Sequence, residues 1–476
     1  MWLEFVSKQY YIIFIFIIKK ILLRVILLTF LLWNLVNIAL KLGEQVSTDS
    51  ATEIISVHNT NQEDTINSSP EILNVYDTIQ ENTINSSLEA PLTEDEKINM
   101  KYCHEKICKF VFPYFHPEQE SRANIHARLY TQLAKPINRT IVISNVGSSR
   151  VQACSKYPFD FYYDMKTFKN FYPGARFITQ EKFLKWIQER KIKPTAQHFW
   201  MIQDGRNDNL SYREKKVKGL YKGVEMGRRE KNRYCLDKFD LNITDYKEFH
   251  TGIKELNEFD RKVMFNLVIN SLKSPPIAES DVIMILNRSP REVFPTIDKV
   301  IPYSPRIIKQ SKSIINKLKP YIAIHWRMEQ GDPELMPQCA KRLVQTVKKI
   351  KKRYGIKNVY FASDFPLNGG KAQSQTFHQI SKSHKEAIKI LKQIKFDTWI
   401  SLGGFSQIRN DPRYETEFKG SGIHGILDKL VCINAKYFLK GPEGCARTSS
   451  TFTSIIVEER EKLKDEYDLI NVVSKW

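Results

Sequence analysis

The sequence predicts an α/β protein in which two halves, each a parallel sheet covered by helices, follow an N-terminal membrane anchor and a stalk. Short apolar, strand-like runs alternate with amphipathic helical stretches both before and after about residue 300, and such alternation is typical of parallel sheets. Residues 1–40 are strongly apolar, and residues 43–95 are rich in Ser, Thr, Asn and Glu. We therefore expect domains at residues 1–42, 43–100, 101–300 and 301–476.

The first domain is expected to be a cytosolic tail and a transmembrane helix. The best membrane-spanning run is Val25–Leu40, and Lys19, Lys20 and Arg24 precede it. Because cations are retained on the cytosolic side, the rest of the chain should enter the lumen of the endoplasmic reticulum or the Golgi. This pattern predicts a signal anchor and a single-pass type II membrane protein. A cleaved signal peptide is the alternative, but no clear small-x-small cleavage site follows the run.

Residues 43–100 are expected to be a flexible stalk that holds a globular part away from the membrane. The motif Thr-Ile-Asn-Ser-Ser occurs in it twice, at residues 65–69 and 83–87. Each copy contains an acceptor sequence for N-glycosylation, which favours a lumenal location. The acceptor asparagines of the whole chain are Asn67, Asn85, Asn138, Asn209, Asn242 and Asn287, the last followed closely by Pro290.

Composition limits the classes of function. The formal net charge is +20, which suits anionic small substrates and membrane surfaces as well as nucleic acid. No zinc-finger spacing, RNP-like aromatic motif or Arg-rich recognition helix is present, so we do not expect nucleic-acid binding. The seven cysteines form no C-x-x-C pair, and no metal site is expected. In a secreted context they predict disulfides with one thiol left over, in a connectivity that the sequence leaves open.

The domain at 101–300 begins with a helical stretch at about 123–134 and a strand at 138–144. Glu120 and Asn124 lie at or near the start of that helix, where a helix N-terminus can bind an anion. Ordinary capping is the alternative. Further alternation is expected at 181–191, 198–203 and 282–286. The basic stretch 212–233 predicts either a solvated loop or a contact for an acidic acceptor.

The domain at 301–476 contains the stretch that we expect to form the site. The apolar run Tyr321–Ile324 predicts a buried strand, and His325, Arg327 and Glu329 follow where it ends. A helix at 339–353 and a strand at 358–363, ending at Asp364, complete a strand–helix–strand unit. Ligands bind at the carboxyl ends of such strands, and an arginine there can hold phosphate with two parallel bonds. A surface ion pair is the alternative interpretation of this arginine.

Two later segments suggest how a nucleotide could be held. A helix at 425–435 carries Asp428, and a run of hydroxyl side chains at 448–451 enters an amphipathic helix. Free N–H groups at a helix start, together with hydroxyl groups, suit a diphosphate. An ordinary Ser/Thr cap is the alternative. With Rossmann-like halves on either side, the cleft between them is the expected ligand site.

Four separated segments now agree, and with them the chain resembles the GDP-fucose protein O-fucosyltransferase superfamily over roughly residues 103–462. The matching segments are Asn138–Thr140, His325–Glu329, Tyr360–Asp364 and Ser449–Phe452 continuing to Arg460. The resemblance implies a GT-B-like fold of two Rossmann-like domains that face a cleft. It also implies an inverting, metal-independent fucosyltransferase that uses GDP-fucose as donor, needs no cofactor and modifies a hydroxyl group of a protein or glycan.

The resemblance also implies roles for individual residues. Arg327 would bind the diphosphate and stabilise the departing GDP, and Glu120 would be the base for the acceptor hydroxyl. Asp428 would bind the guanine edge, and Glu329 would orient Arg327. The other expected substrate-binding residues are His325, Trp326, Ser450, Thr451, Phe452 and Asn124. The turn at 120–124 has no glycine, unlike the family's best-known members. A catalytically degenerate binding module and a transferase for another nucleotide sugar are therefore the alternatives.

Overall fold

The computed structural model describes residues 91–116, 118–202, 236–252, 256–287, 290–367, 372, 377, 379–403, 417, 422–447, 449–472 and 476. The expected anchor, nearly all of the expected stalk, Asn209 and the basic stretch at 212–233 lie outside these residues. Among the described helices none is long and apolar enough to cross a membrane. Contacts between residues divide the chain into two compact units, Met1–Ser87 and Leu88–Trp476. All described residues belong to the second unit.

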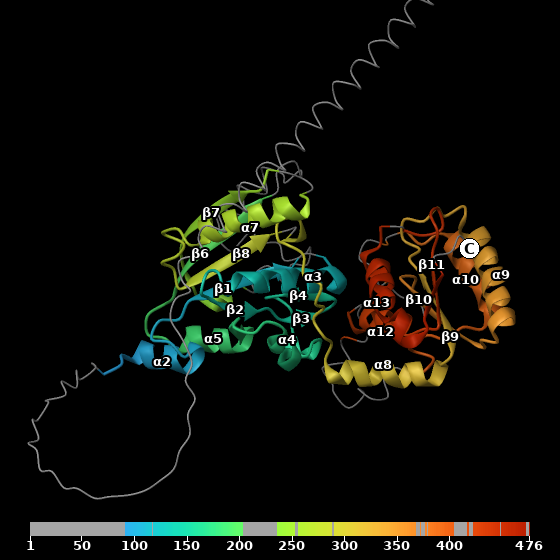
Figure 1. The fold of residues 1–476 in the computed structure, drawn as a ribbon, viewed down its shortest axis with the longest axis horizontal. Coiled ribbons are helices and arrows are strands. Elements are labelled where there is room, and N and C mark those ends of the chain that lie inside the picture. The colour runs from blue at the N-terminus through green and yellow to red at the C-terminus, as the bar shows by residue number, and fades with distance from the viewer. Residues whose placement is uncertain are drawn as a thin grey trace, which may run out of the picture. The chain divides into compact units, whose positions relative to one another are not determined.

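Two sheets organise the described chain, as Figure 1 shows. The first has eight strands in the order β3-β4-β1-β8-β6-β7, with β2 paired to β1 and β5 paired to β2. Its ladders are parallel except where β4 pairs with β1 and β3. The strands are β1 (Phe110–His116), β2 (Thr140–Ile143), β3 (Val146–Gly147), β4 (Arg150–Gln152), β5 (Phe177–Thr179), β6 (Thr195–Ile202), β7 (Asn242–His250) and β8 (Val282–Asn287).

The second sheet has four parallel strands in the order β10-β9-β11-β12. They are β9 (Tyr321–Trp326), β10 (Asn358–Ser363), β11 (Tyr437–Lys440) and β12 (Ile470–Val472). The prediction of a mixed α/β fold is thereby confirmed. The predicted strands at 321–324 and 358–363 appear as β9 and β10, with β9 continuing through His325 and Trp326.

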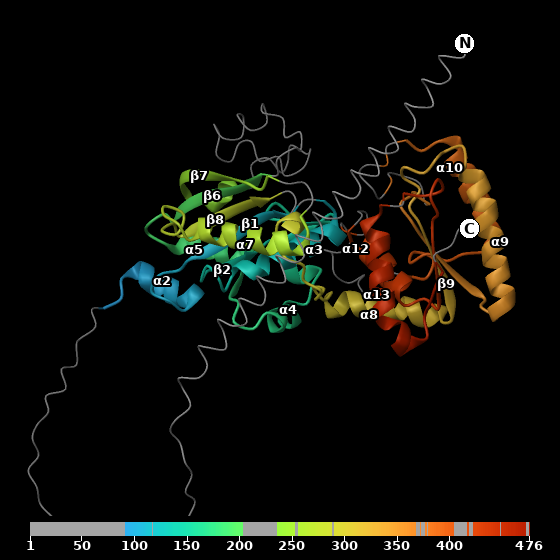
Figure 2. The ribbon, with the colours of Figure 1, turned by 45° about the horizontal axis from the view of Figure 1, so that its top comes forward.

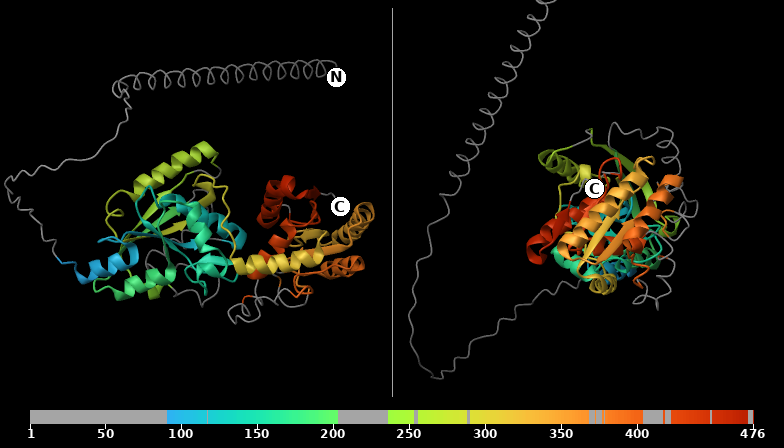
Figure 3. Two further views of the ribbon diagram at one scale, coloured as in Figure 1. Left: turned by 60° about the horizontal axis from the view of Figure 1, so that its bottom comes forward. Right: turned by 90° about the vertical axis from the view of Figure 1, so that its right-hand side faces the viewer.

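Helices cover both faces of each sheet (Figures 2 and 3). Around the first sheet lie α2 (Glu94–Cys103), α3 (Glu120–Tyr130), α4 (Met165–Phe171), α5 (Gln180–Glu189) and α7 (Glu258–Leu272). With the second sheet pack α8 (Pro305–Leu318), α9 (Met336–Tyr354), α10 (Lys382–Leu391), α12 (Gly422–Ile433) and α13 (Thr451–Tyr467). The helix α2 crosses the domain boundary expected at residue 100, and Cys103 at its end is bonded to Cys108.

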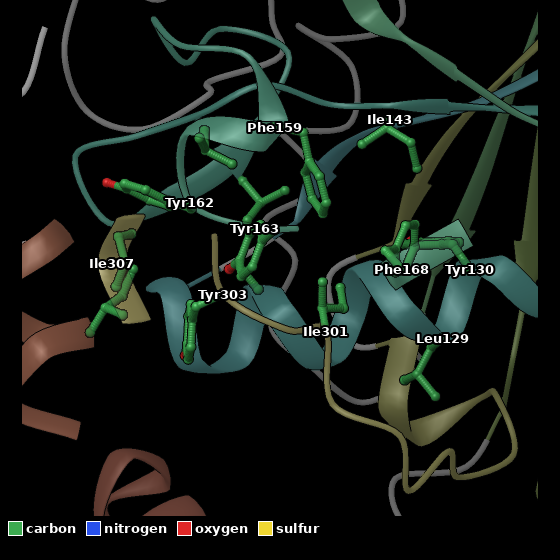
Figure 4. Packing of buried hydrophobic residues seen from close by; sticks show 14 of the residues in the cluster. Leu129, Tyr130, Ile143, Phe159, Tyr162, Tyr163, Phe168, Ile301, Tyr303 and Ile307 are labelled. Atoms are coloured by element: carbon green, nitrogen blue, oxygen red, sulfur yellow. The ribbon is translucent and has the colours of Figure 1, made fainter. Parts of the chain in front are cut away.

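The two-residue period of a strand decides which side chains of β9 reach which layer. Tyr321 and Ala323 pack in a core with residues of α12, whereas Ile322, Ile324 and Trp326 pack in a second core with residues of α9. His325 therefore shares the α12 side with Ala323. The first core also contains the aromatic cluster near α3 that Figure 4 shows.

A buried arginine ties the last helix to its neighbours. Arg460 of α13 is fully buried, and its guanidinium donates to the backbone carbonyls of Cys432, Ile433 and Ala435 at 2.6–3.0 Å and to that of Ile470 at 3.0 Å. Burial lowers the pKa of Arg460 to about 10. These bonds hold the middle of α13 against the end of α12. They therefore also fix the position of the start of α13 relative to α12.

We expect Arg460→Met to reduce the free energy of unfolding by roughly 3 kcal/mol, because several buried carbonyls lose their donor. Lys462→Met on the same helix is the control, since Lys462 is 54% exposed and pairs with Glu459 at the surface. Urea unfolding of both variants checks the prediction. Equal stability of the two variants would contradict it.

Candidate active site

A cavity lies where β9 and β10 end and where three helices begin. It encloses about 840 Å³, including space open to solvent. The helices are α3 on the side of the first sheet, and α12 and α13 on the side of the second. The lining residues are Glu118, Gln119, Glu120, Ser121, Arg122, Ser149, His325, Arg327, Ser363, Asp364, Gly422, Gly425, Asp428, Arg447, Ser449, Ser450, Thr451 and Phe452.

Arg327 is held rigidly at the carboxyl end of β9. One of its nitrogens lies 2.6 Å from Glu329 Oε2, and its Nε lies 3.3 Å from Asp364 Oδ2. Asp364 also accepts the backbone N–H groups of Met328 and Glu329 at 2.8 and 3.0 Å. Burial raises the pKa of Asp364, although the charge of Arg327 opposes that shift. The guanidinium is therefore oriented before any ligand arrives, and its side chain remains 17% exposed toward the cavity.

Two further arginines line the cavity. Arg122 of α3 donates through Nε to Thr451 Oγ1 at 2.8 Å and pairs with Glu118. Arg447 lies 3.6 Å from Glu329 Oε1, and its backbone N–H donates to the carbonyl of Arg327. Arg122 belongs to the helix start at 120–124 that the sequence analysis considered as an anion site, whereas no role was predicted for Arg447, which directly precedes the predicted hydroxyl run. Three guanidinium groups around one cavity favour an anion with several oxygens.

The start of α13 adds backbone donors to this positive surface. Ser450 caps the helix, its hydroxyl accepting the N–H of Thr453 at 3.4 Å, and Thr451 and Phe452 form the first turn. The N-terminus of a helix favours negative charge because its first N–H groups have no partner in the helix. The Ser cap expected as the alternative is therefore present, and the anion site at the same turn stays a prediction.

His325 supports this turn without adding charge. Its Nδ1 lies 2.9 Å from Thr453 Oγ1, and its ring lies 4.7 Å from the ring of Phe452. Burial, with the nearby charge of Arg327, lowers the pKa of His325 to about 3. The imidazole is therefore neutral at physiological pH, and its role is to hold the first turn of α13 against β9.

Asp428 faces the cavity from α12 and is buried. Its Oδ1 accepts a hydrogen bond from the hydroxyl of Tyr360 at 2.5 Å. Burial raises the pKa of Asp428 to about 7, against the opposing effect of Tyr360. A carboxyl group with this pKa can either accept hydrogen bonds from a bound ligand or donate one, depending on pH.

Glu120 is the first residue of α3, and both oxygens of its carboxylate accept hydrogen bonds. Its Oε1 accepts hydrogen bonds from the hydroxyls of Tyr163 and Tyr303, both at 2.9 Å. Its Oε2 lies 2.6 Å from Nζ of Lys429, a neighbour of Asp428 on α12. Sequence reasoning did not find Lys429, Tyr163 or Tyr303, because no local pattern marks them.

Gly422 allows the start of α12 to approach the first sheet closely. A Cβ at this position would lie 2.0 Å from the hydroxyl of Tyr162, 2.7 Å from Glu417 Oε2 and 2.9 Å from the backbone nitrogen of Ser149. Glu417 itself accepts the N–H of Ser148 and the hydroxyl of Tyr162. The absence of a side chain thus brings α12 into contact with the segment that follows β3, at the edge of the cavity.

Seven of the predicted site residues line the cavity, and three do not. Trp326 faces the α9 layer, where its ring N–H donates to the carbonyl of Cys445, since it lies on the opposite face of β9 from His325. Glu329 lies behind Arg327 and contacts it directly. Asn124 lines a second cavity, which begins on the other side of Ser121. The lining residues among the predictions are Glu120, His325, Arg327, Asp428, Ser450, Thr451 and Phe452.

Disulfides hold parts of this region. Cys339 of α9 is bonded to Cys445, which precedes Arg447 by two residues, so the bond anchors the segment that leads into α13. Cys154 is also disulfide-bonded, and Cys432 is a buried free thiol. Among the described residues, no cluster of three or more His, Cys, Asp or Glu side chains could hold a metal ion.

Comparison with known proteins adds the following. A family model described as GDP-fucose protein O-fucosyltransferase matches residues 130–463, well over half of the chain. No curated protein matches. The chain is similar to a crystal structure of POFUT1 in its apo form, at 16% identity over 78% of this chain and 98% of that chain, with a TM-score of 0.44. It is also similar to POFUT1 in complex with GDP-fucose, at 16% identity over 74% and 94%, with a TM-score of 0.43.

A third solved structure is more distant. NodZ alpha-1,6-fucosyltransferase co-crystallised with GDP is 10% identical over 74% of this chain and 92% of that chain, with a TM-score of 0.33. At these identities and TM-scores we draw no residue-level argument from the solved structures. The arguments that follow use the family match and the geometry of the cavity.

The raised pKa of Asp428 should make the free energy of unfolding depend on pH. The ordinary value of 3.8 becomes about 7 in the fold. Between these values the unfolded chain has lost the proton and the folded chain retains it, so stability falls as the pH rises from about 4 to about 7. We expect Asp428→Asn to remove this fall and to exceed the wild type near pH 8 by at most about 4 kcal/mol.

Near pH 3 the Asn variant should have no such advantage, because Asp428 is then mostly protonated in both states. Urea unfolding of the two proteins at both pH values measures the difference. An advantage of the same size at both values would show that the substitution acts through packing and not through the charge.

Proposed function

The chain belongs to the GDP-fucose protein O-fucosyltransferase family, which makes it a glycosyltransferase, and we propose that it moves fucose from GDP-fucose to a hydroxyl group of a protein or glycan acceptor. We further propose a GT-B-like arrangement, in which the parts built on the first and second sheets are the acceptor-side and donor-side domains. The predicted boundaries at 101–300 and 301–476 belong to this proposal.

The observation that supports this function best is the preorganised Arg327. It lines the cavity together with Arg122, Arg447 and the N-terminus of α13. Transfer of a sugar from a nucleoside diphosphate leaves a growing negative charge on the departing phosphate, and fixed cations aimed at that charge lower the barrier. Guanidinium groups can supply this charge directly, which is why we propose transfer without a metal ion or other cofactor.

The remaining cavity residues are proposed to hold the nucleotide. Asp428 would accept the N–H donors of the guanine edge through the oxygen that Tyr360 does not occupy. The backbone of Ser450, Thr451 and Phe452 would bind phosphate oxygens at the start of α13. His325 would hold Phe452 in place, and Glu329 would keep Arg327 in its orientation.

An inverting displacement is proposed for the transfer itself. The acceptor oxygen forms a bond to the anomeric carbon from one face while the bond to the phosphate oxygen breaks on the other, and GDP leaves with the electron pair. The proton of the attacking hydroxyl must pass to a base or to solvent. Glu120, the base expected from the sequence, lies on the cavity wall, but both of its oxygens already accept hydrogen bonds.

The hydrogen bonds that Glu120 already accepts also favour the second candidate function. In this function the protein is a family member that binds nucleotide or glycan without turnover. Binding of GDP without transfer to any acceptor would support it. A competition experiment distinguishes a transferase for a different nucleotide sugar from these two candidates. For such a transferase, UDP-sugars would displace GDP from the cavity.

The first test is thermal unfolding of the full-length protein in detergent with GDP, GDP-fucose or UDP. A ligand at about 100 times its dissociation constant should add roughly 2.7 kcal/mol of stability. We expect stabilisation by GDP and GDP-fucose and not by UDP, and its loss in Arg327→Ala. Fucose transfer by that variant should also be lost, because Arg327 is the preorganised cation proposed to stabilise the departing phosphate.

A matched control is Arg190→Met. Arg190 pairs with Asp95 at 3.6 Å with a side chain that is 10% exposed, and it does not line the cavity. This variant should be less stable than the wild type and still show the full GDP shift. If Arg327→Ala retains the shift as well, the proposed diphosphate site is wrong.

We also propose that the protein is anchored in the membrane by residues 1–42, with its catalytic part in the lumen of the endoplasmic reticulum or the Golgi. Disulfides persist in oxidising compartments, so Cys103–Cys108 and Cys339–Cys445 support this location. The acceptor sequences for N-glycosylation support it as well, since Asn138 and Asn242 are exposed, whereas Asn287 is 3% exposed.

Glycan mapping tests the location. Expressed in a eukaryotic secretory host, the protein should carry N-glycans at Asn138 and Asn242 and none at Asn287, because a glycan cannot be accommodated on a buried asparagine. Enzymatic deglycosylation in heavy-oxygen water, followed by peptide mass spectrometry, identifies each modified site. Unmodified Asn138 and Asn242 in the membrane fraction would argue against a lumenal orientation.

A further inference from the structure

A buried lysine next to the cavity has no part in the transfer described so far. Lys429 follows Asp428 on α12, and its side chain is 3% exposed. Its Nζ lies 2.6 Å from Glu120 Oε2 and donates to the hydroxyl of Tyr303 at 2.8 Å. Because lysine is almost never fully buried unless it is paired, Glu120 is the partner that makes this position possible.

Four side chains satisfy one another's hydrogen-bonding groups here: Glu120, Lys429, Tyr163 and Tyr303. Tyr163 and Tyr303 both donate to Glu120 Oε1, and the centroids of their stacked rings lie 5.7 Å apart. Figure 4 shows these two tyrosine side chains close to α3. Lys429 occupies Oε2. Three of the roughly four acceptor sites of this carboxylate are therefore occupied by donors of the protein itself. A general base must lie within hydrogen-bond reach of the proton that it takes up, so these three donors compete with an acceptor hydroxyl for Glu120.

The network joins segments that carry the nucleotide-binding groups. Glu120 begins α3, and Arg122 of the same turn donates to Thr451 at the start of α13. Lys429 lies one residue after Asp428 on α12. The ion pair therefore fixes the helix that carries Arg122 against the helix that carries Asp428, and so sets the distance between the two groups across the cavity.

The network also separates two cavities. Glu120 lines the nucleotide cavity, whereas Tyr303 and Lys429 line the second one, which encloses about 1150 Å³ including open space. Ser121 lines both. Removal of one charged member would leave the other charge unpaired at this partition. Breaking a buried pair in this way is more disruptive than replacing both members.

We propose that Glu120 and Lys429 are positioning residues: their buried ion pair holds α3 and α12 in the register at which the arginines and Asp428 engage one nucleotide, and Glu120 does not act as the base. This inference rests on the proposed function, since it concerns the same cavity. It predicts that the charge balance of the pair matters and that the carboxylate of Glu120 is not needed for chemistry.

Four variants of the full-length protein test it: Lys429→Met, Lys429→Arg, Glu120→Gln, and the double variant Glu120→Gln with Lys429→Met. The Met variant leaves Glu120 unpaired, and a resulting displacement of about 1 Å can cost on the order of 10²-fold in kcat. The double variant has no unpaired charge and should recover roughly tenfold or more over Lys429→Met. Lys429→Arg retains the charge, although its additional N–H donors find few acceptors, and it should retain roughly tenfold more activity than Lys429→Met.

A base would behave differently. If Glu120 accepted the proton, Glu120→Gln and the double variant would be equally inactive, and the acidic limb of the pH–rate profile would vanish in both. A positioning role predicts that the double variant retains the wild-type pH profile and recovers both kcat and KM for the donor. An inactive double variant that binds GDP as tightly as the wild type would overturn the proposal.

The affinity for GDP separates this proposal from the proposed transferase function on which it rests. Dissociation constants for GDP are measured for the same set of variants, with Arg190→Met as the control for general destabilisation. If the wild type binds GDP but transfers no fucose, the proposed activity fails, and the variants are judged on affinity alone. Recovered affinity in the double variant then supports the pair, and an equal loss in all three non-conservative variants overturns it.

Discussion

The structure depends most on a partly buried cation held between two buried carboxylates at the end of a parallel strand. Arg327 contacts Glu329 and Asp364, and Asp364 also binds two backbone N–H groups of the segment that follows β9. Removing such charges from water costs several kcal/mol for each ion unless geometry and hydrogen bonds compensate. The turn after β9 is therefore determined by electrostatics, and the cavity forms around it.

Much of this region could be predicted from sequence because the relevant information is local. The apolar run at 321–324, the helix that follows and the run at 358–363 together specify a parallel strand pair whose carboxyl ends lie at one edge. Polar residues directly after each run must then meet there. The strand period also explains the outcome for Trp326, which the motif includes but which β9 directs into the α9 layer.

The rest could not be predicted, because it depends on contacts between distant parts of the chain. Glu120 and Lys429 are 309 positions apart, and Tyr163 and Tyr303 contact Glu120 from two other segments. In sequence, Lys429 is one lysine among many in a chain of net charge +20, and a solvated position is the default interpretation. Only the fold shows that Lys429 is buried against Glu120 and Tyr303.

The distribution of cation types follows from their chemistry. The groups that face the cavity, Arg122, Arg327 and Arg447, are arginines, whose planar donors match phosphate oxygens. The buried cation in the partition is a lysine, a compact charge that one carboxylate oxygen and one hydroxyl can satisfy. A guanidinium there would present five N–H donors where the partition offers few acceptors. The cavity thus separates the cations that bind the ligand from the cation that fixes the helices around it.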